Sequence, residues 1–172
     1  MHAVYLASAS ADIESRLRHL ENLSEGLVLR FVDSALPLKE IAAQCGETPA
    51  LVIGGRYDQM SELAHLLPAL RLVQTFTAGT DWLDVAALAQ LGVQVSDNNG
   101  ANANAVAEHT IALILAVYHK LDQQFASAKA GTWQEGVRGP RAEMHTLVGK
   151  RVGLVGLGRI GSRVARRLQG WE

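Results

Sequence analysis

Three glycines, Gly156, Gly158 and Gly161, follow one another at the spacing G-x-G-x-x-G, between a short apolar run and a helical pattern. Glycines in this order allow a tight turn, a close approach of the backbone to phosphate, and close packing of a helix on a strand. The helix start adds free N–H groups and the positive end of its dipole. The pattern therefore favours a site for the pyrophosphate of a dinucleotide; a glycine-rich turn without a ligand is the alternative.

A strand and a helix must flank these glycines if they are to bind phosphate. Arg151–Val155 has the length and β-branched content of a buried parallel strand. Apolar residues then recur at helical spacing from Ile160 to Leu168. The acidic residue that holds the ribose comes about 20 residues later in such folds. The sequence stops at Glu172, so we expect only the opening strand and helix of a Rossmann domain, with unpaired strand edges.

Short apolar runs alternate with amphipathic segments over the first hundred residues. The pattern predicts strands at Ala3–Leu6, Gly26–Val32, Leu51–Ile53, Leu72–Phe76 and Val93–Val95. It predicts helices at Ala11–Leu23, Pro37–Cys45, Ser61–Leu67 and Asp84–Gln90, with Ser61 as a helix cap. Five strands alternating with helices indicate an α/β fold, a doubly wound parallel sheet of the flavodoxin kind.

A polar, turn-forming segment at Ser96–Asn104 predicts a domain junction, which divides the chain into residues 1–100 and 101–172. After it, the pattern from Ala103 to about Ala130 predicts one long helix. Apolar residues cover most of the circumference of its first half, so we expect that half to be buried on nearly all sides.

Composition excludes several classes of protein. No apolar run is long enough to span a membrane and the N-terminus does not resemble a signal peptide, so we expect a cytoplasmic protein. The single cysteine, Cys45, excludes an internal disulfide framework.

Residues 150–172 hold six of the 16 basic residues and one of the 17 acidic ones. They contain no interleaved aromatic residues for stacking on bases, so we do not expect nucleic-acid binding.

The six histidines show no metal-ligand spacing, and we expect no metal site. Glu108 and His109 are adjacent on the predicted long helix. Adjacent helical side chains do not face each other, so these two residues cannot work as a catalytic acid–base pair.

Five ordered motifs together resemble the D-isomer-specific 2-hydroxyacid dehydrogenases, over nearly the whole chain. They are T-A-G-T-D at Thr77–Asp81, A-A-L-A-Q-L-G-V-Q-V at Ala86–Val95, N-x-x-x-V-A-E-H-T at Asn102–Thr110, G-T-W at Gly131–Trp133, and L-V-G-K-R-V-G-L-V-G-L-G-R-I-G at Leu147–Gly161. The resemblance implies a substrate domain in residues 1–100, then an interdomain helix and the start of the NAD(P)-binding domain in residues 101–172. It implies hydride transfer between NAD or NADP and a small 2-hydroxy or 2-oxo acid.

The resemblance also assigns site residues by position. Ala78 and Gly79 fall in the loop that meets the substrate carboxylate, and Asn102 matches a polar residue of the same cleft; Asn102 could equally cap a helix. Arg56 is a further hypothesis, as a residue that contacts the anionic group of the substrate. The alternative is that Arg56 is a solvated surface arginine. The pyrophosphate loop matches Gly156, Gly158, Arg159, Ile160 and Gly161, with Arg159 and Ile160 contributing mainly backbone N–H groups.

The catalytic residues of the family are an arginine and a histidine paired with a glutamate, all downstream of the glycine motif. No position of this sequence matches them, so we expect no catalytic residue here and no activity of this chain alone. The resemblance suggests a homodimer formed through the long helix and the loop that follows it. The alternative function is a non-catalytic module that binds a small acid or forms a dimer.

Overall fold

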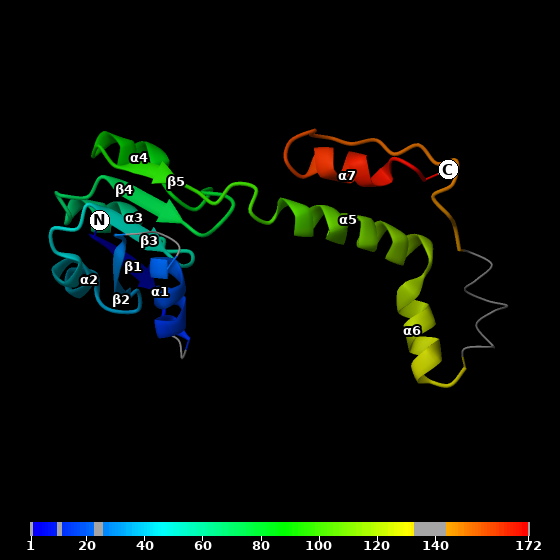
Figure 1. Ribbon diagram of the computed structural model, residues 1–172, viewed down its shortest axis with the longest axis horizontal. Helices are drawn as coiled ribbons and strands as arrows, with labels where there is room; N and C mark the ends of the chain where they lie inside the picture. Colours follow the sequence, from blue (N-terminus) through cyan, green and yellow to red (C-terminus); the bar gives the residue numbers. More distant parts are fainter. Residues whose placement is uncertain (1, 10–11, 23–25, 133–143, 172) are drawn as a thin grey trace. The chain divides into compact units, whose positions relative to one another are not determined.

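Five strands form one parallel sheet in a computed structural model that describes residues 2–9, 12–22, 26–132 and 144–171. They are β1 (His2–Ala7), β2 (Val28–Asp33), β3 (Ala50–Ile53), β4 (Leu72–Thr75) and β5 (Gln94–Ser96). Their order is β2-β1-β3-β4-β5, and every neighbouring pair is parallel (Figure 1). This is the flavodoxin-like order, and it confirms the predicted α/β fold.

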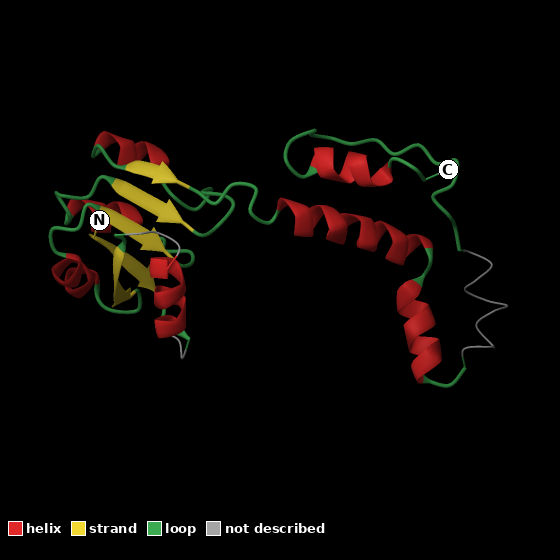
Figure 2. Cartoon of the chain, viewed as in Figure 1, coloured by secondary structure: helices red, strands yellow, loops and turns green. Residues whose placement is uncertain are grey.

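Helices cover both faces of this sheet (Figure 2). They are α1 (Ile13–Asn22), α2 (Leu38–Cys45), α3 (Met60–His65) and α4 (Val85–Gln90). Leu17 and Leu20 of α1 pack on a small cluster around Ala3. The other three helices contribute to the larger core, where Leu51 and Val73 are fully buried. All four predicted helices are found; residues 11 and 23, the predicted ends of the first, lie outside the described residues.

One predicted helix cap is wrong. Helix α3 begins at Met60 with Gln59 at its N-cap, and no side chain caps it. Ser61 is therefore already inside the helix, where its carbonyl oxygen accepts a hydrogen bond from His65. Asp84, by contrast, lies at the N-cap of α4, and its side chain accepts a hydrogen bond from the Ala87 N–H at 2.9 Å.

The described residues divide into two compact units, Met1–Asn99 and Gly100–Glu172. The second unit contains α5 (Ala103–Tyr118), α6 (Leu121–Lys129) and α7 (Gly161–Leu168), and α7 lies alongside α5 (Figure 1).

No helix in the described part of the chain is long and apolar enough to cross a bilayer.

The single long helix predicted from Ala103 to Ala130 is wrong. Lys120 adopts the left-handed conformation, with φ 53°, and separates α5 from α6. Groups from outside α5 bind its last carbonyls: the Gln124 side chain donates to the His119 carbonyl, and the His145 N–H donates to that of Tyr118 at 2.9 Å. The helix ends there because these carbonyls have other partners.

The predicted burial of the long helix is also wrong. Among the described residues of α5, only Ala103 and Ala107 are buried. Leu113 and Val117 are 53% and 70% exposed. The apolar residues around α5 therefore include an exposed surface and do not form a buried core.

The strand predicted at Arg151–Val155 does not form. Residues 151–155 have no strand assignment, and their side chains are exposed. A strand needs a neighbour for its backbone N–H and C=O groups, and no described residue pairs with this segment. Trp133, which ends the fourth motif, lies outside the described residues.

Candidate functional site

The loop after β4, Thr77–Asp81, is held by threonine hydroxyls. Thr77 Oγ1 donates to the Gly79 carbonyl at 2.7 Å, and Thr75 Oγ1 donates to the Thr77 carbonyl at 3.3 Å. Thr75 is fully buried, so the loop is attached to the sheet core. Sequence reasoning missed this role; the signal was a pair of threonines where an apolar strand ends.

Ala78 is exposed and Gly79 half-buried in this loop. Within the described residues, the N–H groups of Ala78 and Gly79 make no hydrogen bond. A Cβ atom at residue 79 would lie 3.5 Å from Asp81 Oδ2, an ordinary contact, so packing alone does not require glycine there. The loop therefore presents free N–H donors, which suit a carboxylate.

Arg56 lies in the loop after β3, and its side chain is 69% exposed. Its Nε donates to Asp58 Oδ1 at 2.6 Å. This partner neutralises the guanidinium, so Arg56 is half of a surface ion pair. The next residue, Tyr57, is buried, and burial raises the pKa of its hydroxyl, which stays protonated at neutral pH.

A cavity of about 470 Å³ opens beside β1 in the first unit. It is lined by Tyr5, Ser15, Arg16, His19, Leu20, Gly54 and Phe76. Tyr5 and Phe76 meet edge to face, with ring centroids 5.8 Å apart. A Cβ atom at Gly54 would lie 2.5 Å from the Tyr5 hydroxyl oxygen, so only glycine fits there. The cavity lies between β1 and the end of β3, where ligands bind in sheets of this order.

The glycine turn precedes α7 and has the geometry that its spacing predicts. Gly156 has φ +87°, a conformation that favours glycine. A Cβ atom at Gly161 would collide with the Gly156 carbonyl oxygen, whereas nothing lies within 4 Å of one at Gly158. The turn therefore closes tightly on the helix and stays open at its middle glycine, as close approach of a phosphate requires.

Free donors surround this open position. Among the described residues, the N–H groups of Gly158, Arg159 and Ile160 make no hydrogen bond. Ile160 is the N-cap residue of α7 and lacks a side-chain cap. The residues present thus fit a pyrophosphate group, which binds to free N–H groups at a helix start.

Asn102 is the N-cap residue of α5, and its carbonyl accepts the Val106 N–H at 2.9 Å. Its side chain is exposed and does not cap the helix. Asn102 belongs to the second unit, whereas Arg56, Ala78 and Gly79 belong to the first.

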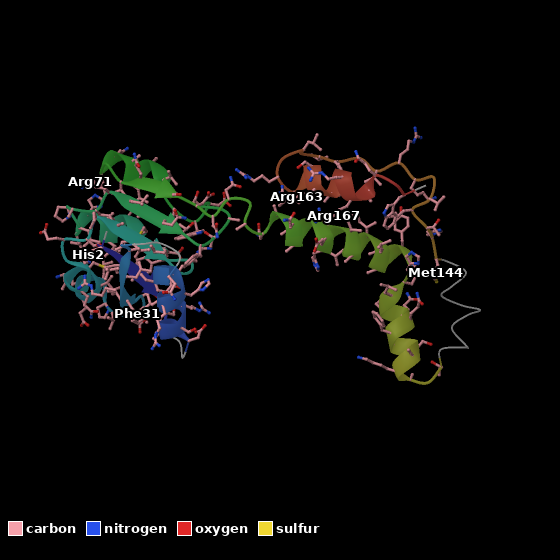
Figure 3. All side chains as sticks on the ribbon, in the orientation of Figure 1. His2, Phe31, Arg71, Met144, Arg163 and Arg167 are labelled. Carbon is pink, nitrogen blue, oxygen red and sulfur yellow. The ribbon has the colours of Figure 1, made fainter. Side chains whose placement is uncertain are left out.

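Two arginines of α7 bind residues of α5 (Figure 3). Arg163 Nε donates to Asn104 Oδ1, and Arg167 Nη2 donates to Glu108 Oε1, each at 2.8 Å. Glu108 is thus engaged in an ion pair with Arg167.

Cys45 is buried at the end of α2, and burial raises the pKa of its thiol to about 11, with the positive charge of Arg30 opposing the rise. A thiol that stays protonated is a poor nucleophile.

In the described ranges, no group of three His, Cys, Asp or Glu side chains could hold a metal ion.

Residues 5–163 match the family described as D-isomer specific 2-hydroxyacid dehydrogenase, catalytic domain. A D-3-phosphoglycerate dehydrogenase from Archaeoglobus fulgidus is 30% identical over 141 residues, which cover 82% of this chain and 26% of that protein. A glyoxylate/hydroxypyruvate reductase from Arabidopsis thaliana is 33% identical over 120 residues, which cover 70% of this chain and 36% of that protein.

Solved structures show the same likeness. An NADPH-dependent glyoxylate/hydroxypyruvate reductase from Sinorhizobium meliloti, in complex with NADP and malonate, matches with a TM-score of 0.70 and 27% identity, over 97% of this chain and 50% of that one. A D-mandelate dehydrogenase from Rhodotorula graminis shares the fold, with a TM-score of 0.78 at 22% identity, over 98% of this chain and 53% of that one. The chain thus spans about half the length of these two structures.

Proposed function

Because this chain belongs to the D-isomer specific 2-hydroxyacid dehydrogenase family, we propose that it serves in hydride transfer between NAD(P)(H) and a small 2-hydroxy or 2-oxo acid. The observation that carries this proposal is the glycine turn, where Gly161 is sterically required and Gly158 leaves space for a ligand. The chain covers about half of its solved relatives, and we propose that turnover needs the remainder of such a protein.

In the proposed reaction, residues of this chain bind the cofactor and the substrate and orient them. The N–H groups of Gly158, Arg159 and Ile160 would hold the pyrophosphate of the dinucleotide. The N–H groups of Ala78 and Gly79 would hold the substrate carboxylate. The resemblance to the family further assigns Asn102 a role in substrate binding. When bound, NAD(P)H would supply the hydride for the reduction of a 2-oxo acid, which also takes up one proton at its carbonyl oxygen. We assign no proton transfer to Glu108, because it is paired with Arg167.

We further propose that two copies of the chain associate through α5 and α6. Leu113, Val117 and Phe125 are 53%, 70% and 63% exposed there. Large apolar side chains on neighbouring helices favour burial against a partner. Sedimentation of the chain at micromolar concentration tests this part of the proposal, and a monomer would count against it.

One observation favours a second function, a module that binds a small acid without turnover. The 470 Å³ cavity is formed within the first unit alone, and Arg16 and His19 line it. Arg16 also pairs with Asp12 at 2.6 Å, which weakens its attraction for an anion. Glyoxylate binding to the chain that is lost in R16A, without any NADH oxidation, would favour this alternative.

The deciding experiment measures NADH and NADPH oxidation with glyoxylate and hydroxypyruvate by the native protein, together with its intact mass. We expect oxidation, and a polypeptide mass near twice the 18.5 kDa of this chain. The mass is measured under denaturing conditions, so that a homodimer of this chain is not mistaken for a longer polypeptide. A native protein of 18.5 kDa that oxidises neither cofactor would contradict the proposal and leave the binding module.

A further inference from the structure

Three contacts join α5 and the turn before it to α7 and the glycine turn, and they recur in matching steps of four residues. The pairs are Gly100 with Arg159, Asn104 with Arg163, and Glu108 with Arg167. In the first pair, a Cβ atom at Gly100 would lie 2.6 Å from Arg159 Cδ, so the arginine side chain packs on the glycine. Because four residues make about one helical turn, the two pairs within the helices lie along one face of α5 and one face of α7. The Gly100–Arg159 contact precedes both helices.

Arg163 is the middle residue of this series and has a second partner in the glycine turn. Its Nε binds Asn104 Oδ1 at 2.8 Å, while its Nη1 donates to the carbonyl oxygen of Arg159 at 2.7 Å. One planar guanidinium thus connects α5 with the peptide that joins Arg159 to Ile160. Figure 3 shows Arg163 reaching from α7 toward α5.

The orientation of the Arg159 carbonyl determines the direction of the next N–H group in the chain, that of Ile160. In a planar trans peptide, the C=O of one residue and the N–H of the next point in opposite directions. By holding the Arg159 carbonyl, Arg163 therefore also sets the direction of the Ile160 N–H, one of the free donors of the turn.

We propose that Arg163 is a positioning residue for the dinucleotide pyrophosphate: it bridges Asn104 and the Arg159 carbonyl, and so keeps the Ile160 N–H turned toward the anion. This inference rests on the proposed function and adds to it a residue that touches neither cofactor nor substrate. It requires the two-pronged geometry of arginine and does not depend on positive charge alone, because a lysine ammonium cannot reproduce the planar fork.

The test uses the full 172-residue chain and two probes, inorganic pyrophosphate and NADH. Backbone amide NMR shifts follow pyrophosphate binding at Gly158 to Ile160, and fluorescence follows NADH. The variants are R163K and R163A, with R166K and R166A as matched controls. Arg166 lies on the same helix, is exposed, and has no side-chain partner among the described residues. N104A removes the side-chain oxygen on α5 that accepts from Arg163, whereas N104D keeps an oxygen at that position.

We expect R163K and R163A to weaken pyrophosphate and NADH binding by about tenfold, the effect of losing a hydrogen bond to a charged group. We expect the Ile160 amide to exchange its hydrogen faster in the same variants without ligand. N104A should show a smaller change in the same direction, and N104D should bind like the unsubstituted chain. R166K should leave both readings unchanged.

Two results separate the inference from the function on which it rests. If the unsubstituted chain binds both probes and R163K behaves like R166K, the positioning role is wrong and the proposed cofactor site stands. If the unsubstituted chain binds neither pyrophosphate nor NADH, the cofactor site itself is wrong, and the positioning role fails with it.

Discussion

The carbonyl oxygen of Gly156 fills the space beside the α-carbon of Gly161. The turn and the first residue of α7 are therefore in direct backbone contact, which no side chain at position 161 would permit. Gly158, two residues after Gly156, has open space around its α-carbon. The outer glycines of the motif serve the fold, and the middle one leaves room for a ligand.

Gly161→Ala and Gly158→Ala should therefore differ. Gly161→Ala should destabilise the chain by about 1 to 3 kcal/mol, the usual range for overpacking, and should also weaken NADH binding. Gly158→Ala should leave the unfolding free energy almost unchanged and still weaken NADH binding, because its methyl group would occupy the phosphate position. Urea unfolding and NADH fluorescence check both expectations. Equal destabilisation by the two variants would contradict this account of the turn.

Asp84 and Ser61 offer a second comparison, between a real cap and a wrongly predicted one. Asp84→Ala removes the acceptor for the Ala87 N–H and should destabilise the first unit by about 1 kcal/mol. Ser61→Ala should change stability by less than about 0.5 kcal/mol, because Ser61 is inside α3 and does not cap it. Thermal unfolding of both variants tests the difference. A larger loss from Ser61→Ala would restore the sequence-based prediction.

Cys45 should make stability fall at alkaline pH. Burial raises the pKa of its thiol from 9.0 to about 11 in the folded chain. Between these pH values the unfolded thiol has lost its proton while the folded thiol keeps it. The stabilising contribution is therefore fully present below pH 9 and declines as the pH rises toward 11, by about 1 to 2 kcal/mol.

Urea unfolding at pH 8 and pH 10.5 measures this decline. Cys45→Ala is the control, since tyrosines and lysines also titrate in this range and remain in the variant. The difference between the two chains should shrink at the higher pH. If their stabilities fall in parallel, ionisation of Cys45 plays no part.

Thr77 should stabilise the loop that presents Ala78 and Gly79. Thr77→Val keeps the shape of the side chain and removes the hydroxyl that binds the Gly79 carbonyl. We expect a loss of about 1 kcal/mol and faster amide exchange at both loop residues. Thr80→Val is the matched control, since the Thr80 side chain makes no hydrogen bond within the described residues. Similar exchange rates in the two variants would show that the hydroxyl does not hold the loop.

The sheet could be predicted from the sequence because β1 to β4 are short, largely apolar and followed by helical patterns. Strand β5 holds only one apolar residue, Val95. Leu51 and Val73, for example, lie in predicted strands and are fully buried. Apolar content alone did not suffice for Arg151–Val155, because a strand forms only where another strand pairs with it. A pattern within five residues carries no information about such a partner.

The end of α5 was unpredictable for a related reason. Nothing in the run from Ala103 to Ala130 resembles a helix terminus, since the residue that adopts a left-handed backbone is a lysine. The carbonyl of Tyr118 is bound by His145, which is distant in the sequence. At the glycine turn, by contrast, the spacing of three residues encodes the local geometry, and the prediction needed no distant partner. The Arg163 bridge was missed because its acceptor, Asn104, is on another helix.

The close approach of Gly54 to the Tyr5 hydroxyl, at 2.5 Å for a Cβ atom at residue 54, has a consequence for how this sequence can diverge. Tyr5 lies in β1, and Gly54 directly follows β3, the neighbouring parallel strand. Side chains at the two positions would compete for one volume. A Cβ atom at residue 54 would also lie 2.8 Å from the Ala7 Cβ. A protein that replaces Gly54 by a larger residue must therefore make room at positions 5 and 7 in the same step, or lose the fit of β1 to the end of β3. Among proteins that descend from this sequence, a residue larger than glycine at position 54 should therefore occur together with smaller residues at positions 5 and 7.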